Sequence, residues 1–474
     1  MEYTIELDKI NNLPVINEGD IINIIDGIYN NINITLQYNG TQNKPITIKA
    51  KNYGKVIIQG NLSISIQGTF ITFGNMIIKG VGLIRIGGHH NRLTNCDISM
   101  NSPSIFIDSV NSRVDHCYFH DFDKSGQWFE ISRPTTEQNF LLVDHNIFKN
   151  RMQGQGNGFE TVRLGTSTKS LSNSNSIIAY NTFENCDGEI EIISIKASDN
   201  IIYKNNFKKS YGSLTLRHGN NNLVVQNKFL QENEANAGGL RVAAGENHVL
   251  YNNLIKDANY GIRLDNGETS GIYNLPVKNT KIIKNVFINN NVDIIIGTSK
   301  FPVSPVNSFF DGNLIYKLTN NPVFDIESSS STSTYVNNKY YALNKGTVLN
   351  NEYMTSINNF NISSIDVNNY GYDENYIGVQ SMININESEI SVDIKSYFTY
   401  LKQSLLNEID GQCFNDTIIV QPTWTIDTTT TTTTTTNLYA DEPLLPSDIP
   451  NVSFKTTLKP TALAIIVMIL FLIK

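Results

Sequence analysis

The chain has 474 residues and a formal net charge of −8, a length that suits one large β-solenoid or two to three ordinary domains. No strongly basic footprint is present, so nucleic acid is not an expected partner; an acidic glycan can bind if cations gather locally or a metal ion is recruited. The cysteines have no CxxC or zinc-site spacing and are too few for a disulfide scaffold: Cys96, Cys117, Cys186 and Cys413.

The first part of the chain contains short strand-like runs instead of long amphipathic helices. Residues 1–13 lack a basic region followed by an apolar one, so no signal peptide is visible. The runs DIINI (20–24) and PITIKA (45–50) read as strands. We expect the repetitive part of the fold to begin near Leu13.

A six-residue pattern then recurs: an apolar residue, two variable residues, Asn or Cys, one further residue, and Phe or Ile. Examples are IIAYNTF (177–183), LVVQNKF (223–229) and KIIKNVF (281–287). Successive copies are 21 to 35 residues apart, which predicts the coils of a parallel β-helix with variable insertions in its loops. The fourth position falls at Asn75, Cys96, Cys117, Asn146, Asn181, Asn205, Asn227, Asn253, Asn285 and Asn313.

These repeats predict an all-β, single-stranded, right-handed parallel β-helix. Asn at one bend can stack on Asn of the next coil, where its amide donates and accepts hydrogen bonds along the stack. The aromatic residue two positions later should point into the core. Cys96 and Cys117 fit this niche as packing residues, with a disulfide along the stack as the alternative. We predict one stack of Asn75, Asn146, Asn181, Asn205, Asn227, Asn253 and Asn285.

Three segments place charge on otherwise apolar coils. They are NGFETVRLG (157–165), GEIEIISIKASDN (188–200) and GSLTLRHG (212–219), and they belong to successive repeats. Residues one coil apart stack at the strand spacing of roughly 4.8 Å. The three segments are therefore expected to share one face.

Glu189 and Glu191 alternate with Ile190 and Ile192. On a strand, both carboxylates would face outward and both isoleucines would enter the core. Adjacent like charges are costly unless a positive charge lies between them, and calcium, a hard cation with oxygen ligands, fits that need. Asn157, one coil earlier, can add an amide oxygen. The alternative is a solvated charged face without a metal.

Lys196 and Arg217 add two cations to this face. Lys196 follows Glu191 by five residues, and Arg217 lies one coil later with His218 beside it. A lysine near an arginine and a metal is pushed toward its neutral form and can act as a base. We expect Lys196 to face solvent. Taken singly, an exposed lysine or arginine is usually an ordinary surface cation.

The repeat pattern weakens after Asn320. We expect residues 13–320 to form the catalytic β-helix, and 321–421 to hold the last coils and a cap with one helix at 396–408. Residues 422–460, which include the threonine run 428–436, read as a stalk. The apolar tail within 461–474 resembles a glycolipid-anchor signal, with a short tail anchor as the alternative. The expected location is the cell surface, with the membrane reached through this C-terminal anchor.

The motifs carry a family resemblance. Residues 19–60 (GDIINIIDGIYNNINITLQYNGTQNKPITIKAKNYGKVIIQG) resemble the opening coils of polysaccharide lyase family six, the chondroitinase B and alginate lyase family. NGFETVRLG, GEIEIISIK and LTLRHG resemble its active-site motifs in the same order. The resemblance extends from about Leu13 to Asn320. It implies calcium as cofactor and an acidic polysaccharide as substrate.

By this resemblance each site residue has an expected role. The implied calcium ligands are Asn157, Glu189 and Glu191. The implied general base is Lys196 and the implied general acid is Arg217. The positions associated with substrate binding are Arg163 and His218. Together they imply β-elimination from a uronate, giving a product with a C4–C5 double bond.

Two other functions stay open from the residues alone. A glycoside hydrolase needs paired carboxylates across a glycosidic bond, which Glu189 and Glu191 could imitate, but it leaves Lys196 and Arg217 unexplained. A non-catalytic, glycan-binding surface protein would fit the stalk and tail. The sequence does not distinguish alginate from dermatan-type chondroitin, although the insertion at 121–133 is one candidate specificity loop. It does not reveal the oligomeric state.

Overall fold

The computed structural model describes residues 1–13, 15–270, 273–297, 300–327, 332–342, 354–357, 361–366, 369–371 and 393–411. Contacts divide the chain into two units, Met1–Ile426 and Asp427–Lys474, and the second lies wholly outside the described residues. Cys413, the threonine run and the apolar tail also lie outside them, so the predictions about stalk and anchor stay predictions.

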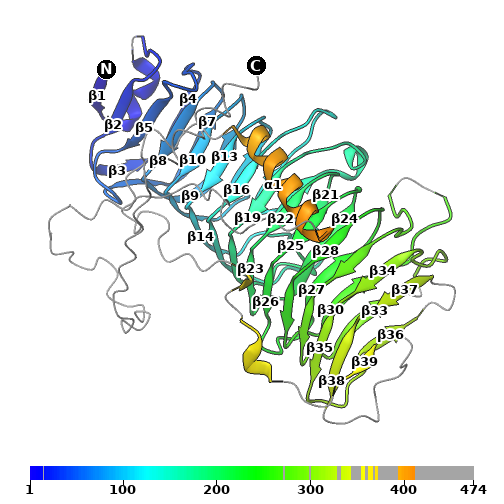
Figure 1. Cartoon of the computed structure of the whole chain (residues 1–474). Coiled ribbons are helices and arrows are strands. Elements are labelled where there is room, and N and C mark those ends of the chain that lie inside the picture. Colours follow the sequence, from blue (N-terminus) through cyan, green and yellow to red (C-terminus); the bar gives the residue numbers. More distant parts are fainter. Residues whose placement is uncertain are drawn as a thin grey trace, which may run out of the picture. The chain divides into compact units, whose positions relative to one another are not determined.

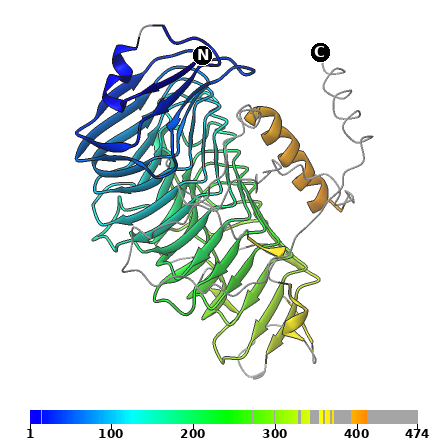
Figure 2. The same ribbon diagram turned by 90° about the vertical axis from the view of Figure 1, so that its left-hand side faces the viewer.

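The described chain winds through three long parallel sheets, and successive coils add one strand to each (Figure 1, Figure 2). Sheet A contains β1 (Glu2–Ile5), β2 (Ile21–Ile24), β5 (Ile46–Ala50), β8 (Ile71–Gly74), β10 (Arg92–Thr94), β13 (Arg113–Asp115), β16 (Leu142–Asp144), β19 (Ile177–Ala179), β22 (Ile201–Tyr203), β25 (Leu223–Val225), β28 (Val249–Tyr251), β31 (Lys281–Ile283), β34 (Ser308–Asp311) and β37 (Ser333–Val336).

Sheet B contains β3 (Gly27–Asn30), β6 (Val56–Gln59), β9 (Ile77–Ile86), β11 (Asp97–Met100), β14 (Tyr118–Phe122), β17 (Ile147–Arg151), β20 (Thr182–Cys186), β23 (Asn206–Lys208), β26 (Lys228–Leu230), β29 (Leu254–Lys256), β32 (Val286–Ile288), β35 (Leu314–Lys317), β38 (Lys339–Ala342) and β39 (Thr355–Ser356). Sheet C contains β4 (Asn33–Leu36), β7 (Asn61–Ile66), the second half of β9, β12 (Ile105–Ile107), β15 (Phe129–Ile131), β18 (Val162–Gly165), β21 (Glu191–Lys196), β24 (Gly212–His218), β27 (Ala237–Val242), β30 (Tyr260–Leu264), β33 (Val292–Ile296) and β36 (Phe324–Ile326).

This arrangement confirms the predicted parallel β-helix. The pairing is parallel throughout these sheets, as in Ile177↔Ile201 between neighbouring coils. Strand β1 already pairs with β2, so the sheet begins before Leu13, where the sequence pattern places its start. Three short 3-10 helices lie among the described residues: η1 (Leu7–Asn12), η2 (Ser167–Lys169) and η4 (Ile362–Ser364).

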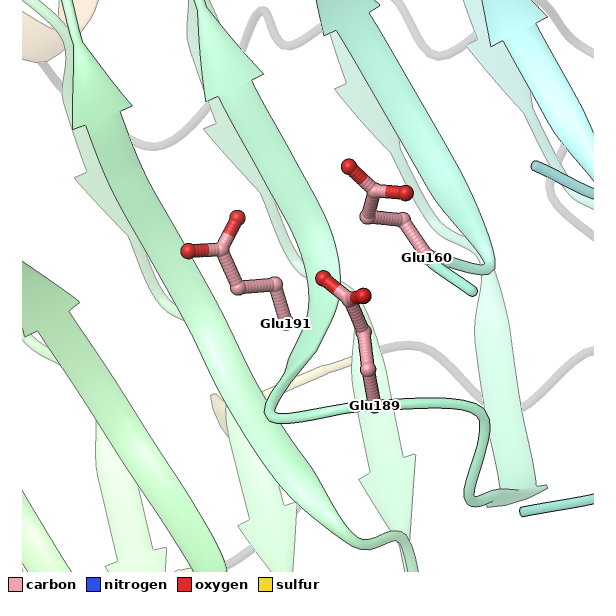
Figure 3. A group of neighbouring side chains, drawn as sticks. All are labelled: Glu160, Glu189 and Glu191. Atoms are coloured by element: carbon pink, nitrogen blue, oxygen red, sulfur yellow. The ribbon is translucent and has the colours of Figure 1, made fainter. Parts of the chain in front are cut away.

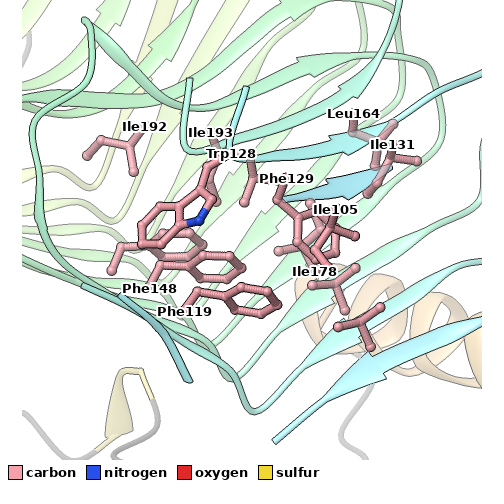
Figure 4. Packing of buried hydrophobic residues seen from close by; sticks show 14 of the residues in the cluster. Ile105, Phe119, Trp128, Phe129, Ile131, Phe148, Leu164, Ile178, Ile192 and Ile193 are labelled. Carbon is pink, nitrogen blue, oxygen red and sulfur yellow. The ribbon is translucent and has the colours of Figure 1, made fainter. Parts of the chain in front are cut away.

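Aromatic residues of the repeat point into the core of the β-helix, as predicted, and their rings also stack from coil to coil. The rings of Phe119 and Phe148 lie 4.8 Å apart and nearly parallel, and Trp128 meets Phe119 edge to face at 6.3 Å (Figure 4). The stack goes on through Phe183, Phe207 and Phe229, all fully buried. Cys96 and Cys117 are buried and have free thiols, so they pack in the core as expected.

The asparagine ladder forms at one bend, with one correction. The Asn181 Oδ1 atom accepts a hydrogen bond from the Asn146 backbone N–H at 3.0 Å. The same contact repeats at 2.9–3.0 Å through Asn205, Asn227, Asn253, Asn285, Asn313 and Asn338.

The prediction for Asn75 is wrong by one residue. Because Gly74 pairs with Thr94, Asn75 lies beside Asn95, and Met76 is the neighbour of Cys96 at the ladder position. Asn75 and Asn95 have positive φ angles of 66° and 56°, a conformation that Asn tolerates better than most residues.

Helix α1 (Ile394–Ile409) covers part of the outer face of sheet A (Figure 2). It includes the helix predicted at 396–408. Asp393 caps it by accepting a hydrogen bond from the Ser396 backbone N–H. Its buried face is Ile394, Phe398, Leu401 and Leu405. Among the described residues, no helix is long and apolar enough to span a membrane.

Candidate active site

The three charged segments meet on the outer face of sheet C. Strands β18, β21 and β24 are consecutive there, with Gly165 beside Lys196 and Lys196 beside His218. The coil-to-coil stacking predicted from the repeats therefore brings together residues that are more than 50 positions apart in sequence.

Three glutamates converge at the start of these strands (Figure 3). Glu160 precedes β18, Glu189 lies in the bend before β21, and Glu191 is the first residue of β21. One carboxylate oxygen of each lies within 4.8 Å of those of the other two, and all three residues are buried. The sequence analysis did not predict Glu160 as a site residue, although Glu160 belongs to the motif NGFETVRLG. Its position just before a strand of the neighbouring coil could have indicated that it lies near Glu189 and Glu191.

The expected alternation around Glu189 is wrong in one respect. Ile190 is 51% exposed, whereas Ile192 and Ile193 are buried. Glu189 and Ile190 precede the strand, and the pairing with β24 is irregular between Glu191 and Ile193. A bulge of this kind adds a residue to one strand and redirects its side chains, which is why two successive isoleucines enter the core.

Burial and neighbouring charges shift the pKa values of two of these carboxylates. Burial, together with the nearby charge of Glu160, raises the pKa of Glu189 to about 7. The Gly158 and Phe159 backbone amides donate hydrogen bonds to Glu189 at 2.7 and 3.1 Å, and these bonds act to lower its pKa but do not outweigh the other two effects. Burial also acts to raise the pKa of Glu160, but a hydrogen bond from Gln127 and the charge of Lys196 outweigh it and lower that pKa overall.

Lys196 and Arg217 each pair with one of these glutamates. The Lys196 Nζ atom lies 3.2 Å from Glu160 Oε1, and the lysine side chain is only 15% exposed, so it does not face solvent as expected. The Arg217 Nε atom lies 3.5 Å from Glu191 Oε1. Since Leu216 pairs with Ile195 and His218 with Lys196, Arg217 is the extra residue of a bulge on β24.

A second arginine, Arg241, which the sequence analysis did not single out, also lies beside Glu191. The Arg241 guanidinium lies 3.6 Å from Glu191 Oε1 and 2.7 Å from Asp265 Oδ2. Asp265 also accepts a hydrogen bond from Arg263 at 2.7 Å. A run of cations therefore continues along sheet C beyond Arg217.

The two predicted substrate residues differ in their surroundings. Arg163 is partly buried and pairs with Glu130 at 2.5 Å. His218 is buried, and burial together with the charge of Arg217 lowers its pKa to about 4, so it is neutral near pH 7. His218 and Arg217 line a cavity of about 320 Å³ whose other walls are Thr166, Ser167, Thr168, Tyr273 and Asn274.

The acidic cluster fits a calcium ion. Calcium binds oxygen ligands at about 2.3–2.6 Å, and one carboxylate oxygen from each glutamate lies within 4.8 Å of the other two, so a single ion could contact all three. The raised pKa of Glu189 reflects first its burial and then the negative charge of Glu160, and a cation would offset that charge. Asn157 lies beside Gly158 in the same loop, with an exposed side chain, and its role as a ligand remains a prediction.

Comparison with known proteins identifies the class. The family model described as chondroitinase B matches residues 5–294, and together with the fold this makes the protein a β-helical polysaccharide lyase. The chain belongs to the chondroitinase B family, as its motifs indicate. Among curated proteins, none matches it significantly in sequence.

Solved structures share the fold. One is a mannuronic acid-specific family 6 lyase from the human gut microbiota, with 23% identity and a TM-score of 0.70 over 85% of this chain and 99% of that one. Another is the family 6 alginate lyase AlyGC, with 24% identity and a TM-score of 0.71 over 83% of this chain and 59% of that one. A family 6 alginate lyase solved with a trisaccharide has 20% identity and a TM-score of 0.65 over 75% of this chain and 87% of that one.

Proposed function

We propose that the protein is a calcium-dependent lyase that cleaves a uronic-acid-containing polysaccharide by β-elimination. The observation that carries the proposal is the convergence of three buried glutamates with Lys196 and Arg217 on one face of sheet C. A hydrolase requires an acid and a base or nucleophile at a glycosidic bond and leaves both cations without a role.

The proposed metal ligands are Glu189, Glu191 and Asn157, with Glu160 next to them. Calcium held there would supply positive charge that offsets the uronate C6 carboxylate and makes the C5 proton more acidic. Arg217 and Arg241 lie on the same wall as Glu191. They would attract and orient the negative groups of the glycan.

In the proposed reaction, Lys196 first releases its ammonium proton to solvent, and the neutral amine then takes the proton from C5. The electron pair of that C–H bond becomes the C4–C5 double bond, and the C4–O4 bond breaks with its electrons leaving on O4. Arg217 stabilises the departing oxygen and assists its protonation. Since arginine has a pKa above about 12, its contribution is partly electrostatic. A proton that reaches O4 from solvent by way of Arg217 can protonate the leaving group.

The proposed substrates are polyuronates of the alginate type and dermatan- or chondroitin-type chains. Two of the structural relatives are alginate lyases, and one of these was solved with a trisaccharide. Proteins this distant establish the fold alone, so the glycan has to be found by assay.

Formation of unsaturated product tests the proposal. The purified protein, incubated with alginate, polymannuronate, polyguluronate, dermatan sulfate or chondroitin sulfate, should raise ultraviolet absorbance with at least one of them. Chelator should abolish the increase and calcium should restore it. Cleavage that yields saturated ends would indicate a hydrolase, and glycan binding without cleavage would indicate a binding protein.

A further inference from the structure

A loop far away in sequence reaches back to the proposed catalytic arginine. Arg217 Nη1 donates a hydrogen bond of 3.1 Å to Asn274 Oδ1, across 57 positions of sequence. Asn274 belongs to the connection between β30 and β31, outside the three motifs that carry the predicted chemistry. Both residues line the same cavity.

This loop is tied down independently of Arg217. Gly267 and Val303 exchange backbone hydrogen bonds of 2.7 and 3.0 Å, and the Glu268 backbone N–H donates to the Asn274 carbonyl at 2.8 Å. The Asn274 side-chain amide also donates to Glu268 Oε1 at 2.5 Å. That second bond directs the amide nitrogen toward Glu268 and leaves the amide oxygen facing the guanidinium.

Arg217 has particular need of such a contact. It is the bulged residue of β24 and its side chain is 29% exposed, and a long arginine side chain has many accessible rotamers. Glu191 holds its Nε side at 3.5 Å, while Asn274 holds Nη1 on the other. The chain of contacts Glu268–Asn274–Arg217 thus restrains the guanidinium beside the metal-site glutamate.

We propose that Asn274 is a positioning residue that holds Arg217 in its reactive orientation, with Glu268 orienting the Asn274 amide. The inference rests on the proposed lyase function and adds to it a residue outside the shared motifs. Because small displacements of a catalytic group cost up to about 100-fold in rate, the loop should affect turnover more than it affects folding.

Asn274→Ala tests the contact directly. We expect kcat on the polyuronate that the parent cleaves to fall by about 10- to 100-fold, with a smaller change in KM and little change in melting temperature. Asn321→Ala is the matched control, since Asn321 makes a surface side-chain hydrogen bond to Asn291 on another loop, and it should retain parental kcat.

A polarity swap separates positioning from general damage. Asn274→Asp alone places a carboxylate against Glu268 and should lower kcat. Adding Glu268→Gln lets the new amide donate to the new carboxylate, which can still accept from Arg217, so the double variant should recover most of kcat.

Each result has one meaning. If the parent yields no unsaturated product from any polyuronate, the lyase proposal fails and the inference fails with it. If the parent is active and Asn274→Ala keeps parental kcat, only the inference is overturned. The same holds if kcat falls together with the melting temperature and the swap recovers neither.

Discussion

Lys196 and Glu160, on neighbouring coils, form an ion pair in which Nζ lies 3.2 Å from Oε1, the glutamate being almost wholly buried. Gln127 holds the other oxygen of Glu160 at 3.0 Å. The proposed base therefore also compensates a buried carboxylate, and its catalytic and structural contributions have to be measured apart.

Lys196→Ala should remove most of kcat, because loss of a positioned base costs about 10²- to 10⁴-fold. It should also lower the free energy of unfolding by about 1–3 kcal/mol, because Glu160 is left without its cation. Adding Glu160→Gln should restore stability in chemical denaturation while product formation stays low. Lys149→Ala, which breaks the more exposed pair with Glu184, is the control. A Lys196→Ala enzyme working at the parental rate would contradict the assignment of the base.

Arg217→Ala should reduce kcat at least as much as Lys196→Ala and should also raise KM, since the guanidinium is proposed to contact the glycan in both ground and transition states. Steady-state kinetics on a defined oligosaccharide would measure both constants. Arg85→Ala, which removes an exposed pair with Asp108, should leave both constants unchanged. An equal rate for the two variants would exclude Arg217 from the reaction.

The stability of the metal-free protein should depend on pH through Glu189. Its folded-state pKa of about 7 lies above the ordinary value of 4.5, so the folded state binds more protons than the unfolded state between these values. The stabilising contribution is complete below about pH 4.5 and is lost as the pH rises through about 7. Melting temperatures in chelator should fall over this range.

Calcium should reverse that trend, because the ion binds the deprotonated carboxylates. The rise in melting temperature on adding calcium should be larger near pH 8 than near pH 5. Glu189→Gln should flatten the pH dependence in chelator and weaken calcium binding in calorimetry. Glu184→Gln, on sheet B, is the control. An unchanged pH profile in Glu189→Gln would show that another group is responsible.

Asn205→Ala should destabilise the fold by about 1–3 kcal/mol or more, since it leaves buried backbone groups unpaired on neighbouring coils. Asn205 accepts from the Asn181 backbone N–H and donates to Ile178 O and Asn227 Oδ1. Denaturant unfolding would measure the loss, with Asn321→Ala as a surface control. A loss no larger than the control's would mean that the ladder contributes little.

The fold could be predicted because the repeat pattern itself indicates the coils of a parallel β-helix. Most coils have a buried Asn at the bend and a buried Phe or Ile two residues later, and these two positions indicate where each coil bends and where its core lies. Asn75 was wrongly predicted to belong to the asparagine ladder because Asn also suits the positive-φ position one residue before the ladder. Local composition alone does not distinguish these two uses of Asn.

The site was predicted less completely for a different reason. Glu189, Glu191, Lys196 and Arg217 belong to motifs on successive coils, so stacking brings them together. Strand alternation failed at Ile190 because Glu189 precedes the strand and a bulge follows it. Asn274 comes from a connecting loop, whose path depends on contacts such as Gly267 with Val303 that carry no repeat signal.

The bulge at Arg217 limits how this enzyme can change over evolution. Duplication or loss of a whole coil away from the site would move one end of the solenoid by a strand spacing and leave the reactive face intact. Deleting Arg217 would remove the bulge and the guanidinium beside Glu191, whereas deleting another residue of β24 would exchange inward and outward side chains along the rest of that strand. Descendants should therefore vary freely in coil number and loop length, while the residue count between Leu216 and His218 stays fixed.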